Sequence, residues 1–294
     1  MHPPARAVTS GPPSRPTVLV DILDLERIEE DIFRGRSPRG RWQRVFGGQV
    51  AGQALVAAGR TVTPDRAVHS LHAYFIRPGD PEVPIVYTVD RVRDGRSFTT
   101  RRVTAIQHGR AIFTLSASFH RQEEGLEHQE AMPDAPAPEL LTDWPERSGP
   151  EAEPGSDPPP PRPVEIRPAG VSGEPGELRR MVWMRARDML PDDPLLHVCA
   201  VAYASDMTLL DSVTLGHELS WEDGRLSAAS LDHAMWFHWP FRADEWLLYV
   251  QRSPAASGAR GLAQGTIFRR DGLLVASVVQ EGLIRLQPPP AAPA

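Results

Sequence analysis

The sequence contains no lysine, so arginine supplies every long basic side chain. This absence excludes the chemistries that depend on lysine: a Schiff base, a P-loop lysine and a serine–lysine pair. The chain has one cysteine, Cys199, which excludes an internal disulfide and a thiolate metal site. A single thiol fits a reducing compartment, so we expect a cytoplasmic protein.

Long apolar runs are equally scarce. No stretch approaches the roughly 20 apolar residues that span a bilayer, and residues 1–16 lack the apolar core of a signal peptide. We therefore expect no membrane span, and disordered tails over 1–16 and 288–294. The formal net charge of -6 argues against a nucleic-acid partner.

Several motifs that carry well-defined chemistry are also absent. The sequence holds no G-x-S-x-G, no H-E-x-x-H, and neither the Rossmann nor the P-loop glycine pattern. We therefore expect no nucleophile-elbow hydrolase, no cofactor and no bound metal.

Proline is abundant and divides the chain. Residues 133–163 include the runs PDAPAP and GPEAEPGSDPPPPRP. Proline at this density sustains neither a helix nor a central strand, so this segment is predicted to be a linker, stiff where the prolines adjoin. It separates an N-terminal unit over 17–132 from a C-terminal unit over 164–287.

The two units resemble each other strand by strand, at a steady offset of 162 or 163 residues. Each has an aromatic-rich strand that ends at proline, then a second strand, then a long hairpin with a glycine turn. A chance resemblance would not keep this register over three strands. The matching segments are His69–Pro78 with Ala229–Pro240, Ile85–Arg93 with Trp246–Arg252, and the turns His108-Gly109 with Asp271-Gly272.

Each unit also has one helical segment ahead of its strands, Gly47–Ala58 in the first and Pro194–Leu210 in the second. The first is dense in glycine and alanine. Glycine inside a helix costs about 1 kcal/mol relative to alanine, but small residues let a helix lie close against a sheet. The expected class is α+β: a central helix wrapped by an antiparallel sheet, twice over.

Asp206 is a carboxylate on an otherwise apolar helical stripe. Its neighbours at four and seven residues include Cys199, Ala202 and Leu210. An unpaired buried charge is costly, and such carboxylates often mark functional sites. The alternative is a residue at the helix end that reaches solvent or a capping partner.

Two further polar residues lie on strands. Alternation in LLVASVVQEGLIRL places Gln280 on an apolar face, where its amide needs partners; a structural bond to backbone is the alternative. Alternation in LSAASLDHAMWF places Ser230 on the face of Asp232 and opposite His233. Most strand serines are structural, so the pattern alone gives Ser230 little weight.

Gly47 and Gly48 open the first predicted helix. Free N–H groups at a helix start can hold an anion or an oxyanion, while a plain helix start packed against backbone is equally compatible. Asp232 and His233 are adjacent and point to opposite faces, so they cannot pair with each other.

Several segments, in order, resemble the acyl-CoA thioesterase II (TesB-type) family. The resemblance runs from about Asp24 to Leu286 and implies a double hotdog fold. It also implies hydrolysis of acyl-CoA to free CoA and fatty acid, in dimers or tetramers of double hotdogs. The segments are RVFGGQVAGQAL, VHSLHAYFIRPGD, RDGRSF, YASDMTLL, SLDHAMWFHWPF, EWLLY and VVQEG.

The resemblance further implies a catalytic set of an aspartate, a threonine or serine, and a glutamine. By motif these fall on Asp206, Ser230 and Gln280, all in the second unit. In the first unit Ser116 or Ala117 stands near the place of the glutamine. One active site per chain is therefore expected.

This set suits direct attack by water, because a thioester is already electrophilic. The expected substrate is a fatty acyl-CoA of medium to long chain. Asp206 would take a proton from the water, which Ser230 and Gln280 would position. A helix N-terminal amide would face the developing oxyanion. Arg260 is the candidate contact for the CoA phosphates.

Two other functions remain open at this stage. A hotdog hydratase acting on enoyl or hydroxyacyl thioesters would need an Asp/His pair, which Asp206 with His233 or His197 could supply. A non-catalytic acyl-CoA binding protein would keep the pocket and lose turnover. Thiol release, loss of enoyl absorbance, and binding without turnover distinguish the three.

Overall fold

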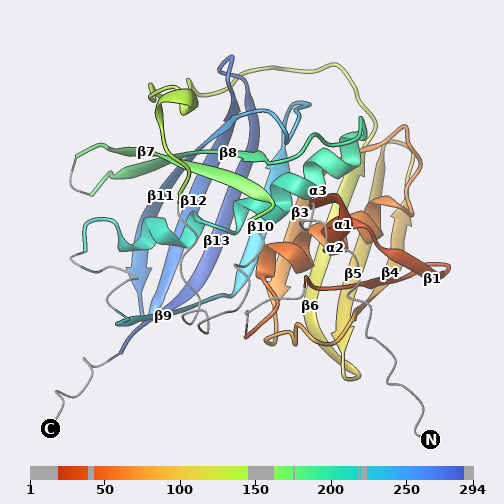
Figure 1. The fold of residues 1–294 in the computed structure, drawn as a ribbon. Coiled ribbons are helices and arrows are strands. Elements are labelled where there is room, and N and C mark those ends of the chain that lie inside the picture. Colours follow the sequence, from red (N-terminus) through yellow and green to blue (C-terminus); the bar gives the residue numbers. More distant parts are fainter. Residues whose placement is uncertain are drawn as a thin grey trace, which may run out of the picture.

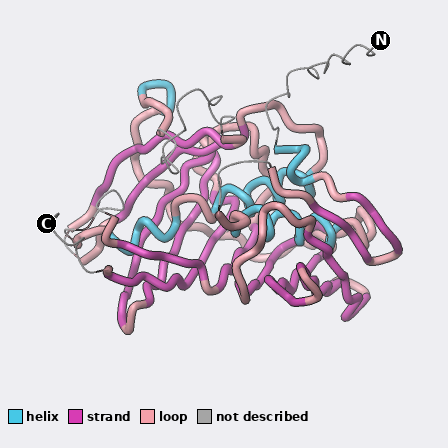
Figure 2. The backbone as a smooth tube through the Cα atoms, turned by 60° about the horizontal axis from the view of Figure 1, so that its bottom comes forward, coloured by secondary structure: helices cyan, strands magenta, loops and turns pink. Residues whose placement is uncertain are grey.

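The computed structural model describes residues 19–38, 43–144, 162–174, 176–217, 219 and 224–287. The two predicted tails, 1–16 and 288–294, lie outside the described residues. Across the described part, 13 strands form one antiparallel sheet, and the main helices lie against one side of it (Figures 1 and 2). No helix among the described residues is long and apolar enough to cross a membrane.

The sheet consists of two halves with mirrored strand order. In the first half the order from the edge is β1 (Glu26–Glu29), β2 (Ile32–Gly35), β4 (Ile85–Asp94), β5 (Phe98–Gln107), β6 (Arg110–His120) and β3 (Ala67–Phe75). In the second half the order from the seam is β10 (Asp232–Phe237), β13 (Leu274–Leu286), β12 (Arg260–Arg269), β11 (Leu247–Ser257), β8 (Arg179–Ala186) and β7 (Val164–Ser172). The short strand β9 (Leu226–Ser230) pairs separately with β13.

The halves join through β3 and β10, which pair antiparallel from Ser70 opposite Trp236 to Tyr74 opposite Asp232. Figure 1 shows these strands at the middle of the molecule, between the yellow and the blue strands. The backbone hydrogen bonds of the sheet therefore continue from one half into the other.

The predicted repeat is confirmed at the level of single rungs. Gln280 stands opposite Ala263 in the β13–β12 ladder, and Ala117 stands opposite Arg101 in the β6–β5 ladder, 163 and 162 residues earlier. The predicted glycine turn at His108-Gly109 is also present, with φ of 49° and 71°. Positive φ at both central residues gives the turn a twist that matches the flanking strands.

Two helices occupy the centre: α2 (Gly47–Gly59) and α3 (Pro194–Ser205). Shorter elements are the helix α1 (Leu19–Leu23) and the 3-10 turns η1 (Pro138–Leu140) and η2 (Leu209–Thr214). The main hydrophobic core fills the space between the helices and the sheet, and it includes Leu55, Leu71, Tyr87 and Tyr249.

The glycines of α2 serve a contact that the sequence did not reveal. A Cβ at Gly48 would lie 2.2 Å from the Tyr203 carbonyl oxygen, and one at Gly52 would lie 3.1 Å from the Cys199 carbonyl oxygen. Both carbonyls belong to α3, which runs antiparallel to α2. The small residues therefore allow close approach of the two helices, rather than of a helix to the sheet as expected.

Two predicted elements were too long. The second helix ends at Ser205 instead of Leu210, and the chain continues into η2. The predicted strand Ala229–Pro240 is divided into β9 and β10 at Leu231. Both differences bear on the candidate site.

Four strands escaped prediction: β1, β2, β7 and β8. β1 reads ERIE and is exposed throughout, so it carries no apolar alternation. β8 reads RRMVWMRA and has the opposite property, since its four central residues are all buried. Alternation disappears when both faces of a strand are covered.

The outer cover of β8 comes from residues 129–144, which include the start of the predicted linker. The Trp183 indole donates to the Pro136 carbonyl at 2.8 Å, and Arg270 binds the Glu139 carboxylate at 2.7 and 2.9 Å. Met132 and Leu141 pack on the same outer apolar cluster. This part of the segment is a strap across the second half; residues 145–161 lie outside the described residues.

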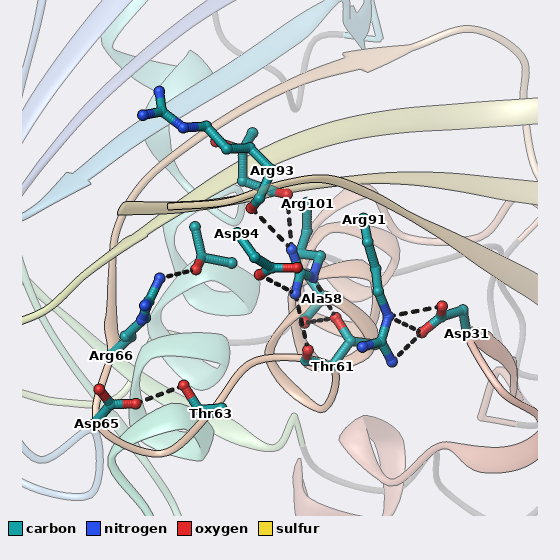
Figure 3. Close-up of polar contacts among 12 residues, drawn as sticks. Asp31, Ala58, Thr61, Thr63, Asp65, Arg66, Arg91, Arg93, Asp94 and Arg101 are labelled. Atoms are coloured by element: carbon teal, nitrogen blue, oxygen red, sulfur yellow. Dashed lines mark hydrogen bonds and ion pairs between the residues drawn. The ribbon is translucent and has the colours of Figure 1, made fainter. Parts of the chain in front are cut away.

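The end of α2 is tied to the β4–β5 hairpin by a buried arginine (Figure 3). Arg101 is 2% exposed and donates to the Thr61 hydroxyl at 2.9 Å and to the Thr61 carbonyl at 3.1 Å. It also binds Asp94 at 2.7 Å, but that carboxylate is 57% exposed, so the ion pair adds little stability. The bonds to Thr61 are the ones that fix the helix end.

Candidate active site

Asp206 follows the last residue of α3 and is the C-cap of that helix, with φ of −80° and ψ of −8°. It was predicted within a helix; instead it lies where the helix ends, with backbone angles still in the helical region. The residue as a whole keeps some exposure, but its carboxyl group is enclosed. The three groups that enclose it come from three different elements.

The three predicted catalytic residues meet at one oxygen atom. The Gln280 side-chain amide donates to Asp206 Oδ1 at 2.6 Å, and the Ser230 hydroxyl donates to the same oxygen at 3.2 Å. The Gly48 backbone N–H also bonds the carboxylate. β13, β9 and the start of α2 therefore converge on the end of α3.

Ser230 reaches this position because the segment from β9 to β10 contains one residue more than the part of β13 with which it pairs. Ser230 pairs with Gly282 of β13, whereas Ala234 pairs with Val279. Four steps along one strand thus face three steps along the other, which is a β-bulge centred near Leu231.

The bulge corrects the predicted alternation. Ser230 and His233 were expected on opposite faces, but both point toward α3: Ser230 bonds Asp206, and His233 Nε2 lies 2.9 Å from the Ser205 hydroxyl. A regular strand would turn one of them outward. The strand break therefore brings the serine to the carboxylate.

Glycine is required at the start of α2. A Cβ at Gly47 would lie 2.6 Å from Asp206 Oδ2, closer than side chains approach. The N-terminus of a helix carries partial positive charge, which favours an adjacent carboxylate. Gly47 and Gly48 thus lie at the predicted site, with the Gly48 amide directed at Asp206 itself.

The environment of Asp206 raises its pKa from 3.8 to about 6. Burial is the main cause, because it disfavours the charged form; the bonds from Gln280, Ser230 and the Gly48 amide lower the pKa and offset part of the effect. A carboxyl group with this pKa is ionised at neutral pH, yet basic enough to accept a proton.

The side-chain oxygen of Gln280 is available as a hydrogen-bond acceptor in the site. Its amide nitrogen binds Asp206, while its Oε1 is buried and makes no hydrogen bond within the described residues. A buried acceptor without a partner is costly unless a further group binds there. The oxygen can therefore accept a hydrogen bond from a water molecule or a ligand.

Arg260 lies apart from this cluster. It is half exposed, pairs with Glu281 at 3.0 Å, and stands opposite Leu283. Gln280 stands opposite Ala263, three residues along β12, so Arg260 is about 10 Å away along the strand. Its assignment to the CoA phosphates stays a prediction.

Neither candidate histidine bonds Asp206 in the described part of the chain. His233 bonds Ser205, and burial lowers its pKa to about 4, so it is neutral. His197 accepts from the Ala243 amide near the other end of α3. The Asp/His pair that a hydratase would need is therefore not formed.

Sequence reasoning missed Ser205, Tyr249 and Phe75. Phe75 ends β3 and would contact a Cβ at Gly47 at 2.8 Å, so it lies beside the site. The Tyr249 hydroxyl donates to the Ser205 carbonyl at 3.3 Å. The repeat contained a signal for this tyrosine, since Tyr87 stands 162 residues earlier in the matching strand.

No group of three or more His, Cys, Asp or Glu side chains within the described ranges could hold a metal ion. The site contains one carboxylate, one hydroxyl, one side-chain amide and helix N-terminal amides. Such a set can position a water molecule, remove its proton and stabilise an oxyanion.

Comparison with solved structures identifies the fold class. A protein of unknown function with a hot dog fold from Alicyclobacillus acidocaldarius matches 94% of this chain and 98% of its own, with a TM-score of 0.72 and 22% identity. At that identity the likeness shows the fold alone. The chain is a double hotdog, as the sequence predicted.

Comparison with protein families identifies the family to which the chain belongs. The family described as acyl-CoA thioesterase matches residues 160–283, and the acyl-CoA thioesterase N-terminal domain matches residues 37–120. Acyl-coenzyme A thioesterase 8 of Mus musculus is 43% identical, over 93% of this chain and 91% of the relative. Acyl-CoA thioesterase II TesB2 from Mycobacterium marinum is 49% identical, with a TM-score of 0.79 over 92% of this chain and 99% of that one.

The chain therefore belongs to the acyl-CoA thioesterase family. It is a thioester hydrolase, and the resemblance seen in the sequence is confirmed.

Proposed function

We propose that this enzyme hydrolyses fatty acyl-CoA of medium to long chain by direct attack of a water molecule that Asp206 activates. The observation that supports this proposal is the convergence of Gln280 and Ser230 on one oxygen of a carboxylate whose pKa is about 6. These bonds hold Asp206 Oδ1, while Oδ2 lies beside Gly47 at the start of α2, where we place the substrate water.

In the proposed reaction the water oxygen attacks the thioester carbonyl carbon while its proton passes to Asp206. Gln280 Oε1 accepts the second hydrogen of the water. When the tetrahedral intermediate collapses, the carbon–sulfur bond breaks, and the CoA thiolate takes the proton from Asp206. The products are a fatty acid and CoA, and the carboxylate is regenerated.

The oxyanion would be stabilised at the start of α2. Gln49 and Val50 donate their amides to the Phe46 carbonyl, and the Gly48 amide bonds Asp206. The Gly47 amide is therefore our candidate for the oxyanion donor, in the positive field of the helix N-terminus.

The test is release of free thiol from acyl-CoA substrates of increasing chain length, with wild type and Asp206→Ala. Loss of a general base lowers the rate about 10²–10⁴-fold, and wild type should prefer medium or long chains. In the same assay Arg260→Gln should raise KM at unchanged kcat, whereas Arg269→Gln, at the far end of β12, should change neither. A folded Asp206→Ala protein with full activity would refute the assignment.

Three further proposals accompany this function. We place the enzyme in the cytoplasm because its one cysteine is buried and unpaired, and in fatty acid metabolism because the product of the proposed reaction is a fatty acid. We propose a dimer or tetramer of double hotdogs, with domain boundaries at 17–132 and 164–287. Light scattering on the purified protein tests the assembly, cell fractionation tests the location, and limited proteolysis tests the boundaries.

A further inference from the structure

Ser205, the residue before Asp206, is held by two strands of the sheet. Its carbonyl oxygen accepts from the Tyr249 hydroxyl of β11 at 3.3 Å, and its own hydroxyl lies 2.9 Å from His233 Nε2 of β10. All three side chains are almost fully buried: Ser205 is 0% exposed, Tyr249 0% and His233 1%.

The donor and the acceptor in each of these bonds can be assigned from the hydrogens that each group carries. The Ser205 hydroxyl has one hydrogen, and both the Ala202 carbonyl at 3.0 Å and the Met235 sulfur at 3.5 Å lie within reach of it. With the hydrogen on either of these acceptors, the hydroxyl accepts from His233, and we assign the proton of the neutral ring to Nε2 on that basis. The Tyr249 hydroxyl donates because a carbonyl oxygen can only accept.

These bonds hold the C-terminal end of α3, where helices are least stable. The last carbonyls of a helix have no intrahelical partners, and helix ends fray. Asp206 is attached to such an end, so without other contacts its carboxyl group would shift with the last turn. A misplacement of about 1 Å at a reacting group can cost about 10²-fold in rate.

The first half contains a matching tyrosine, Tyr87, which does not bond the last turn of α3. Tyr87 stands opposite Ala105 and Tyr249 stands opposite Ile267, which is the same rung of the two ladders. Tyr87 is also 0% exposed, but it donates to Gln53 Oε1 at 2.7 Å, in the middle of α2. Only the second tyrosine binds the residue that precedes the catalytic carboxylate.

We propose that Tyr249 and His233 are positioning residues, which fix the last turn of α3 so that Asp206 meets the bound water. This inference rests on the proposed function of Asp206. Neither residue touches the substrate; both act through Ser205.

The experiment compares Tyr249→Phe with Tyr87→Phe. Each substitution removes one buried hydroxyl from the same rung of the repeat, so the two melting temperatures should fall by similar amounts. Tyr249→Phe should lower kcat about 10- to 100-fold with KM within about twofold. Tyr87→Phe should leave kcat within about twofold of wild type.

A second pair of variants tests His233. His233→Gln keeps a side-chain N–H donor for the Ser205 hydroxyl, and His233→Leu removes it. The glutamine variant should recover at least about tenfold in kcat over the leucine variant, in proteins that melt within a few degrees of each other. A merely structural role would give equal rates at equal stability.

The outcomes separate this proposal from the one on which it rests. If Asp206→Ala abolishes turnover and Tyr249→Phe keeps the wild-type kcat, the positioning role is wrong and the catalytic assignment stands. Equal losses of kcat in Tyr249→Phe and Tyr87→Phe would also overturn it, since the effect would then come from the fold in general. If Asp206→Ala retains full activity, the catalytic assignment itself fails.

Discussion

At the scale of single residues, Asp206 combines two properties that have opposite effects on its pKa. It is enclosed, which raises its pKa to about 6, and it receives three hydrogen bonds, which favour the charged form. The balance leaves a carboxylate that is ionised at neutral pH but costly to keep ionised. Catalytic sites often carry such a cost in stability.

That cost can be measured with Asp206→Asn, which mimics the neutral acid. Because the folded pKa lies above the unfolded value of 3.8, the folded state holds the proton longer as pH rises. The contribution of Asp206 to stability is therefore complete below about pH 3.8 and is lost as pH rises through about 6. Two units of pKa correspond to about 3 kcal/mol.

We expect wild type and Asp206→Asn to have similar free energies of unfolding near pH 4. Near pH 8 the variant should be the more stable protein, by about 2 to 3 kcal/mol. Urea denaturation at the two pH values measures the difference. A variant that is less stable than wild type at pH 8 would contradict the raised pKa.

At the scale of elements, the site depends on the close contact of α2 with α3. The antiparallel packing brings the start of one helix to the end of the other, where Gly48 and Asp206 meet. The positive end of α2 thereby faces both a carboxylate and the negative, C-terminal end of α3. A side chain at this contact would separate the helices.

Gly48→Ala should therefore be destabilising, because its Cβ would lie 2.2 Å from the Tyr203 carbonyl. Overpacking of this kind costs about 1 to 3 kcal/mol, and the displaced amide should also lower kcat. Urea denaturation and thiol release measure the two effects. Gly125→Ala is the control, since a Cβ there meets no atom within 4 Å; equal behaviour of the two variants would refute the argument.

At the scale of the whole molecule, the two halves share a sheet and a core. β3 pairs with β10, α2 packs on α3, and one hydrophobic cluster contains residues of both halves. Neither half can unfold without exposing the core of the other. The site itself takes Gly48 from the first half and the catalytic trio from the second.

We therefore expect a single cooperative unfolding transition. Far-UV circular dichroism reports on the sheet of both halves, while tryptophan fluorescence reports mainly on the second half, where Trp183 and Trp246 are buried. The two probes should give the same midpoint in urea. Two separated midpoints would show that the halves are independent domains.

The sequence by itself determined the parts that depend on local pattern. It predicted the repeat, the helix that begins at Gly47 and the hairpin turn at His108, and it marked Asp206 and Gln280 as polar residues among apolar ones; Ser230 became a candidate only through the resemblance to a family. Alternation, helical spacing and glycine turns are properties of neighbouring residues, so one chain reveals them. It failed at β8, because that strand is covered on both faces.

Tertiary structure alone decided how the candidates meet. The bulge near Leu231 depends on the pairing with β13, and the last turn of α3 is held at Ser205 by Tyr249 and His233. These partners lie 28 to 44 residues away from Ser205 in the chain. Local pattern contains no information about such contacts, since they form only when the sheet closes around the helix.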